Sequence, residues 1–156
     1  MDVSNIISLI PSIIVLIALW KIFVKMGEPG WKAIIPFYSE YILFQKTWKT
    51  VYFFAQLVST FGAIVALYAS GALVMPNESE NMVTGIGNTP LLVVGVILFI
   101  IALVISVLSY YHLSKSFGHG VGFTIGLLFL SIIFYLILAF DSSKYLGNLT
   151  LEDDEE

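Results

Sequence analysis

Residues 91–111 read LLVVGVILFIIALVISVLSYY, an apolar run with no charged side chain. A helix needs about 18 such residues to cross the hydrocarbon core of a bilayer, and this run is long enough. Three further apolar runs are near or above this minimum of about 18 residues. They are Ile6–Val24, Val51–Met75 and Val121–Phe140. We therefore expect an all-α polytopic membrane protein with four transmembrane helices over residues 1–147 and a disordered acidic tail at 148–156.

The composition excludes an ordinary water-soluble domain. Hydrophobic residues make up 58% of the chain, and the charged fraction of 12% is about half that of soluble proteins. The mean hydropathy is +0.94. The chain has no cysteine, so disulfide and thiolate chemistry are absent. All seven basic residues are lysines, and without arginine a nucleic acid is not an expected partner. The expected partner is the lipid bilayer.

The positions of the lysines predict the orientation of the chain. Six of the seven lie at the end of the first run, between the first two runs or between the last two, and only Lys144 lies elsewhere. Cytoplasmic loops are enriched in lysine, so these connections are expected in the cytoplasm. Asp141 and the five acidic residues of the tail fall on the other side. Both termini are therefore expected outside the cytoplasm.

The connection between the first two runs has a composition that predicts local structure. Gly27-Glu28-Pro29-Gly30 indicates a turn, and Pro36 suits the first turn of a helix. From there an aromatic stripe recurs at helical spacing, formed by Phe37, Tyr41, Phe44 and Trp48. We expect a short interfacial helix within residues 31–49, beginning near Pro36, with this stripe on its buried side. The stripe could lie on lipid or could pack on the ends of the spanning helices, and its periodicity does not distinguish the two.

Small residues recur at four-residue intervals in two of the expected spans. Rows of this kind let helix backbones approach closely in lipid. Packing within one bundle is the favoured explanation, and association of two copies is the alternative. The rows are Gly62, Ala66 and Ser70 in the second span, and Gly118, Gly122 and Gly126 at the start of the fourth.

No constellation of residues indicates catalysis, and neither an enzyme activity nor a cofactor is expected. Ser142 and Ser143 stand too close in sequence to Lys144 to face it across a serine–lysine site. A metal site built from His112, His119 and Glu40 is the weaker alternative to two interfacial histidines.

Two stretches carry a resemblance to a known family. Residues 25–31, KMGEPGW, are followed by IIPFY at 34–38, and LSKSFG stands at 113–118. These motifs resemble the signature of a family of small bacterial multi-span membrane proteins of unknown function. The resemblance implies the bacterial inner membrane as the location. It also implies work beside the secretion machinery, because similar modules occur fused ahead of signal peptidase I domains.

The expected function is that of an accessory or structural subunit of a larger envelope complex, linked to protein export or assembly. The alternative is a small oligomeric transporter or channel around a polar seam of Gln56, Ser59 and Thr60. Other integral membrane proteins are the expected partners, and a homo-oligomer is possible. The candidate interaction residues are Trp31, Phe37, Tyr38, Tyr41, Phe44, Trp48, Gly62, Ala66, Ser70, Gly118, Gly122 and Gly126.

Overall fold

The computed structural model describes residues 3–72 and 88–148, with side chains from residue 10 onward in the first helix. Over these residues the chain is helical and contains no strand. It divides into two units, the first made of the described residues up to Phe53 and from Val107 onward, the second of those from Phe54 to Ser106. The helices are α1 (Val3–Lys25), η1 (Gly30–Ile34), α2 (Tyr38–Thr47), α3 (Thr50–Ala69), α4 (Thr89–Ser116), α5 (Val121–Phe129) and α6 (Ser131–Phe140).

The predicted turn after the first apolar run ends α1 in the first unit. Gly27 has a φ of 76°, its N–H bonds to Val24 O, and the N–H of Glu28 bonds to Phe23 O. This pair of hydrogen bonds is the Schellman arrangement, which needs a left-handed residue after the helix and favours glycine there. The chain then turns into the short 3-10 helix η1.

Helix α2 begins two residues later than Pro36, because Pro36 belongs to a tight turn. The N–H of Tyr38 bonds to Pro36 O at 2.7 Å across Phe37, whose φ and ψ are 62° and −42°. This is close to a classic γ-turn, a rare and strained conformation for a residue with a side chain. Such a conformation costs about 1–3 kcal/mol and persists only where its surroundings hold it.

The fourth expected span is wrong as a single helix. The stretch 121–140 is divided at Leu130, whose φ and ψ of −128° and 44° leave the helical region, into α5 of nine residues and α6 of ten. The two helices pack against each other as a hairpin, and a side chain on Gly126 would meet the ring of Phe134 at 2.1 Å. Ten helical residues extend about 15 Å, half of a bilayer core.

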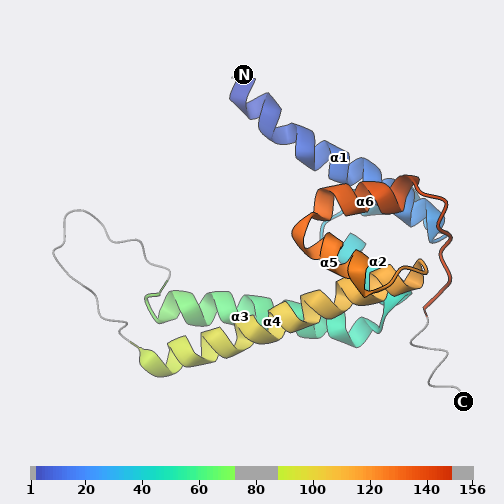
Figure 1. Cartoon of the computed structure of the whole chain (residues 1–156). Helices are drawn as coiled ribbons and strands as arrows, with labels where there is room; N and C mark the ends of the chain where they lie inside the picture. Colours follow the sequence, from blue (N-terminus) through green and yellow to red (C-terminus); the bar gives the residue numbers. More distant parts are fainter. Residues whose placement is uncertain (1–2, 73–87, 149–156) are drawn as a thin grey trace, which may run out of the picture. The chain divides into compact units, whose positions relative to one another are not determined.

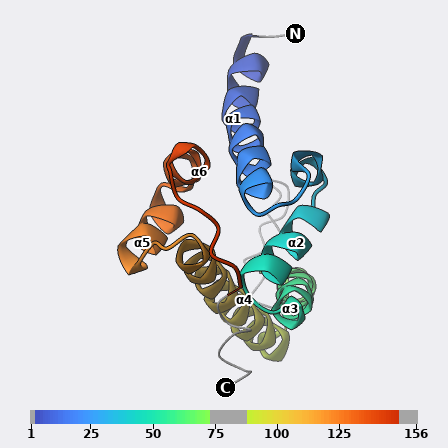
Figure 2. The ribbon, with the colours of Figure 1, turned by 90° about the vertical axis from the view of Figure 1, so that its right-hand side faces the viewer.

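The first unit has its hydrophobic core between the two ends of the chain. Helix α6 packs against α1 and crosses it obliquely, so that Figure 1 shows both helices from the side and Figure 2 shows α6 end-on beside α1. The fully buried side chains between these elements include Ile22 and Phe23 from α1, Leu127 from α5 and Leu138 from α6. The end of α4 contributes Leu113 and Phe117 to the same core.

The second unit is formed by most of α3 and α4. A side chain on Gly62 would meet Leu98 at 3.0 Å, and one on Gly95 would meet Leu67 at 2.9 Å, so both glycines lie where the two helices approach closely. Helix α3 ends earlier than expected, at Ala69, in a Schellman turn at Gly71. The rest of the second expected span, residues 73–75, lies outside the described residues.

Two helices, rather than the four expected, are long and apolar enough to cross a membrane among the residues described: α3, with 20 residues, and α4, with 28. Helices α5 and α6 are too short because of the break at Leu130. Helix α1 has 23 residues but is not one of the two, and the side chains of residues 3–9 lie outside the description. Of the expected acidic tail, residues 149–156 also lie outside it.

Candidate functional site

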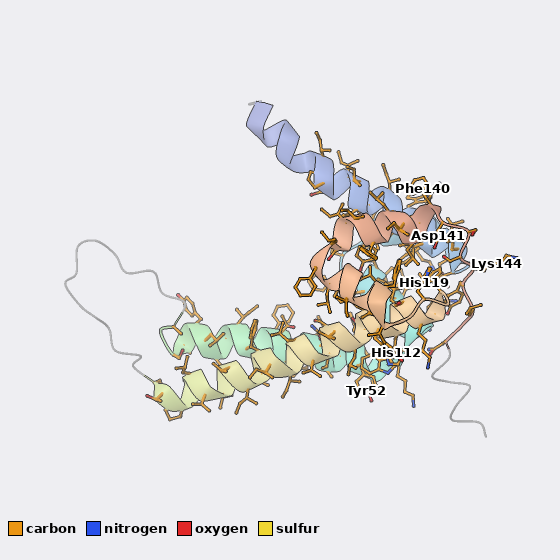
Figure 3. All side chains as sticks on the ribbon, viewed as in Figure 1. Tyr52, His112, His119, Phe140, Asp141 and Lys144 are labelled. Carbon is orange, nitrogen blue, oxygen red and sulfur yellow. The ribbon has the colours of Figure 1, made fainter. Side chains whose placement is uncertain are left out.

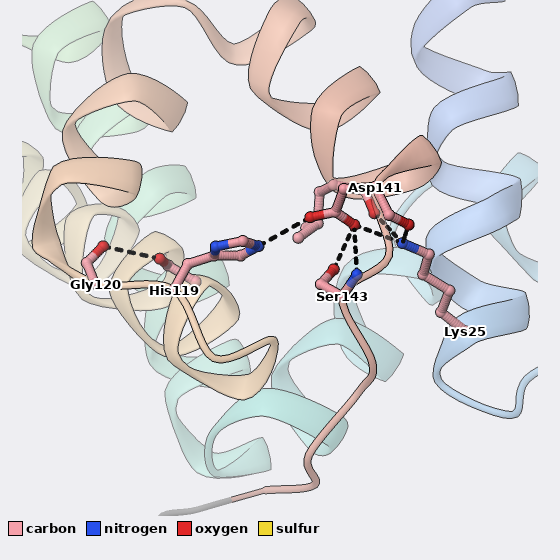
Figure 4. A network of polar contacts seen from close by, with 7 residues as sticks. Lys25, His119, Gly120, Asp141 and Ser143 are labelled. Atoms are coloured by element: carbon pink, nitrogen blue, oxygen red, sulfur yellow. Dashed lines mark hydrogen bonds and ion pairs between the residues drawn. The ribbon is translucent and has the colours of Figure 1, made fainter.

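The most connected polar group in the first unit is the carboxylate of Asp141, directly after α6 (Figure 4). Its Oδ1 accepts hydrogen bonds from Lys25 Nζ at 2.8 Å and from Ser143 Oγ at 2.5 Å. Its Oδ2 lies 3.1 Å from Nε2 of His119. Asp141 therefore joins the end of α1, the turn between α4 and α5, and the end of α6.

Lys25 also satisfies the backbone at the end of α6. Its Nζ donates to the carbonyl oxygens of Leu138 at 2.6 Å and Asp141 at 2.9 Å. The last carbonyls of a helix have no partner within it, and they carry the negative end of the helix dipole. One ammonium group thus caps α6 and pairs with the carboxylate that follows it.

The contacts of the Asp141 carboxyl hold it in its charged form. Burial by itself raises its pKa, but the hydrogen bonds from Lys25 and Ser143 outweigh burial and lower the pKa to about 2. The carboxyl group of Asp141 is therefore ionised at any physiological pH. We call the group formed by Lys25, His119, Asp141 and Ser143 the clamp.

The clamp joins two residues that the lysine pattern predicts on opposite sides of a membrane. Lys25 and Asp141 lie 2.8 Å apart, so these two residues do not lie on opposite sides. The physical reason is the break at Leu130, which divides the expected span into two short helices that pack together. His119 and Asp141, which flank the hairpin, lie together in Figure 3.

A second ionic cluster joins η1 to α2. The carboxylate of Glu28 accepts from Lys32 Nζ at 2.7 Å and from Lys46 Nζ at 3.0 Å, each through a different oxygen. The hydrogen bonds from these two lysines lower the pKa of Glu28, and the bond to Glu28 raises the pKa of Lys32. The turn predicted from Gly27-Glu28-Pro29-Gly30 thus carries an acid that fixes α2.

The segment after Asp141 returns to the ends of two other helices. Tyr145 Oη donates to Lys46 O at 2.5 Å, and Asn148 Nδ2 donates to Gln45 O at 3.1 Å and to Trp48 O. The N–H of Leu146 bonds to Ser116 O, the last residue of α4, at 2.8 Å. Carbonyls at the ends of α2 and α4 therefore gain donors from residues 145–148. No sequence pattern predicts these contacts.

The aromatic residues singled out in the sequence divide into buried and exposed groups. Phe44 and Trp48 are buried, and the Trp48 ring stacks on Tyr52 at 3.8 Å and on His112 at 4.6 Å. Tyr41 meets the ring of Phe53 edge-on at 5.6 Å. Trp31, Phe37 and Tyr38 are exposed, so Phe37 does not share the buried side expected for the stripe.

The small residues singled out in the sequence occupy different settings. Ala66 on α3 and Ser70 in the turn that follows α3 are both buried, and Ser70 Oγ donates back to Leu67 O at 2.8 Å. Gly118 has a φ of 77° and ends α4, so it belongs to a turn. In α5, a side chain on Gly122 would meet nothing within 4 Å, in contrast to Gly126.

The described residues offer no metal centre, since no group of three His, Cys, Asp or Glu side chains stands close enough to hold an ion. His112 instead stacks on Trp48, and His119 contacts Asp141. Ser143 donates its hydroxyl hydrogen to Asp141, while Lys144 is exposed at the edge of Figure 3. The polar groups around Asp141 hold the ends of α1 and α6 together.

The polar residues of the expected seam lie in the second unit. Gln56 Nε2 donates to Ser106 Oγ at 3.0 Å, while Gln56 Oε1 is buried and accepts no hydrogen bond there. Ser59 Oγ bonds to carbonyl oxygens of its own helix, Ala55 O at 2.7 Å and Gln56 O at 3.2 Å.

Residues 78–148 match a protein-family model described as a family of unknown function (DUF5684). The match includes the stretch LSKSFG at 113–118 and the α5–α6 hairpin, whereas the motif at 25–38 lies outside it. This part of the chain, less than half of it, is therefore similar to a family for which no function is described. No curated protein and no solved structure matches the chain.

Proposed function

We propose that the protein is a multi-pass membrane protein that acts as an accessory or structural subunit of a larger membrane complex. The observation that carries the proposal is the surface of the second unit. Its described residues include no charged side chain, and large apolar groups stand outward on α3, with Val58 72% and Val65 66% exposed. An uncharged surface with large exposed apolar side chains needs lipid or another apolar partner to cover it.

The polar groups of the first unit support the same proposal. Asp141 and Glu28 are each engaged by lysines of the same chain, so neither is open to a polar substrate. A transporter usually places ionisable groups on a substrate path within the membrane. Binding of other membrane helices needs only packing surfaces, which the exposed sides of α3 and α4 offer.

The proposal includes a revised topology. The segment from Asp141 to Asn148 contacts the ends of α2 and α4, which brings Lys144 to the same end of the first unit as the other lysines. All seven lysines then fall on one side, and the enrichment of lysine in cytoplasmic loops assigns that side to the cytoplasm of a bacterial inner membrane. Residues 121–140 are a re-entrant hairpin in this arrangement.

We extend the proposal to a complex for protein export or assembly, on the strength of the motif resemblance alone. The accessory role itself can be tested in native membranes with photoreactive amino acids at Val58 and Val65, which lie seven residues apart on one side of α3. The expected result is a protein adduct of one discrete mass from both positions. The adduct from position 58 should be lost when Val65→Asp is added, and no such adduct should form from the control position Ser142. Lipid adducts alone would contradict the accessory role.

A small transporter or channel is the second candidate, because Gln56 Oε1 is buried on α3 without a hydrogen-bond donor. Water or a polar solute could supply that donor. Saturable flux of a solute into liposomes containing the purified protein alone, abolished by Gln56→Leu and kept by Val58→Leu, would replace the accessory role with this one.

A further inference from the structure

An exposed apolar surface lies between α1 and α2 in the first unit. It consists of Trp31, Ile34, Ile35 and Phe37, which we call the knuckle. Each of the four is at least 42% exposed, and Phe37 is the most exposed at 58%. These four residues lie within the seven positions 31–37 of η1 and the turn that follows, so the surface is local in sequence.

The 3-10 helix directs these side chains outward by its period of three. Residues three apart in such a helix lie above one another. Gly30 and Ala33 form the buried side, and a side chain on Gly30 would overlap the indole of Trp20 at 2.3 Å. Trp31 and Ile34 form the opposite side and are therefore held outward by the packing of η1 on α1.

The backbone at Phe37 is strained in a way that also favours exposure. A glycine would adopt a φ of 62° without strain, yet the position carries a large aromatic side chain that is 58% exposed. Strain of this kind persists where the surrounding structure fixes it, and it is concentrated at functional positions. The exposed position of the Phe37 ring is therefore accompanied by an unfavourable backbone conformation.

The charges beside the knuckle are paired within one cluster, which keeps a net charge of +1 because two lysines share one carboxylate. Lys32, between Trp31 and Ala33, pairs with Glu28 and lies 5.9 Å from the centre of the Tyr38 ring. Lys46 pairs with the same carboxylate. Any surface that covers the knuckle therefore meets apolar and aromatic groups, with an internally paired cluster behind them.

We propose that the knuckle inserts into the boundary between headgroups and acyl chains of the bilayer on the lysine-rich side. Tryptophan and tyrosine favour this depth, where one edge of the ring is apolar and the other meets water. A lipid surface fits better than a partner helix, because the outward side of η1 has none of the small residues that let helices approach closely. The inference rests on the proposed membrane location.

The test uses the full-length protein in phosphatidylcholine vesicles, with a nitroxide at single cysteines in the cysteine-free chain. Ile34→Cys reports on the knuckle, and Ser142→Cys, an exposed polar position, is the control. Oxygen concentrates in lipid and a nickel chelate in water. The ratio of the nitroxide's collision rate with oxygen to its collision rate with the nickel chelate is expected to be several-fold higher at position 34 than at position 142.

Changes at Phe37 separate insertion from folding. In the Ile34→Cys protein, Phe37→Gly removes the ring and the strain, so the ratio is expected to fall while thermal stability in detergent is kept. Phe37→Leu is expected to keep the ratio. Equal ratios at 34 and 142 in protein that floats with the vesicles, or a nitroxide at 34 shielded from both reagents, would overturn insertion alone. Failure to float with the vesicles would overturn the membrane location itself.

Discussion

The ammonium of Lys25 lies 2.8 Å from the carboxylate of Asp141, although the two residues are 116 positions apart in the chain. Lys25 is the last residue of α1, and Asp141 directly follows α6. One ion pair thus joins the first and last described helices of the first unit at the same end. It also caps α6, since the same ammonium reaches Leu138 O.

Removing either partner of this pair is expected to destabilise the protein. The two side chains are 21% and 22% exposed, and loss of a hydrogen bond to a charged group at such a site costs about 1–3 kcal/mol. In a cycle of Lys25→Met, Asp141→Asn and the double variant, measured by unfolding in detergent, the effects should be coupled. Lys144→Met, at an exposed position, should change stability by less than about 0.5 kcal/mol. Strict additivity of the two changes would show that the pair contributes no coupling.

The same carboxylate predicts how stability depends on pH. The pKa of Asp141 is lowered from 3.8 to about 2, so its stabilising effect is complete above pH 3.8 and is lost as the pH falls toward 2. The shift corresponds to an upper limit of about 2 kcal/mol. The difference in unfolding free energy between the native chain and Asp141→Asn should shrink over that interval and stay constant above pH 5. A difference that does not change between pH 5 and pH 2 would contradict the assignment.

Single cysteines test on which side the hairpin ends lie. Lys115→Cys, at the end of α4, and Ser142→Cys, after α6, are both exposed positions of the first unit. Because His119 and Asp141 meet between them, both cysteines should resist a membrane-impermeant maleimide in intact cells and react after permeabilisation. Labelling of Ser142→Cys alone in intact cells would restore a full span over 121–140.

The helical character of the chain and the turn at Gly27 follow from local sequence, because apolar runs and glycine–proline pairs act over a few residues. The break at Leu130 does not, since Phe129, Leu130 and Ser131 contain no strong helix breaker. Contacts distant in sequence favour the hairpin: Phe134 packs on Gly126, and Lys25 caps the end of α6. The sequence of residues 121–140 cannot predict the contact with Lys25, because Lys25 lies outside that stretch.

The break at Leu130 also explains why the lysine pattern wrongly separates Lys25 from Asp141. Counting lysines across loops is sound only when each apolar run crosses the membrane once. The break at Leu130 replaces the expected span with two short helices, which is why Asp141 lies beside Lys25 instead of a membrane thickness away. Phe37 shows a similar limit, because its spacing from Tyr41 is helical while its backbone forms a γ-turn.

Two glycines on one helix give a matched test of the hairpin. A side chain on Gly126 would stand 2.1 Å from the ring of Phe134, and that ring cannot easily withdraw because it packs edge-on against Phe123 at 5.0 Å. Overpacking of this kind costs about 1–3 kcal/mol, so Gly126→Ala should lower the unfolding temperature in detergent. Gly122→Ala, four residues away and facing open space, should be neutral or stabilising, because alanine is favoured over glycine in a helix by about 1 kcal/mol. Adding Phe134→Leu to Gly126→Ala should recover part of the loss by making room for the new methyl group. If Gly126→Ala and Gly122→Ala behaved alike, the close approach of α5 and α6, and with it the return of the chain to the lysine-rich side, would have to be abandoned.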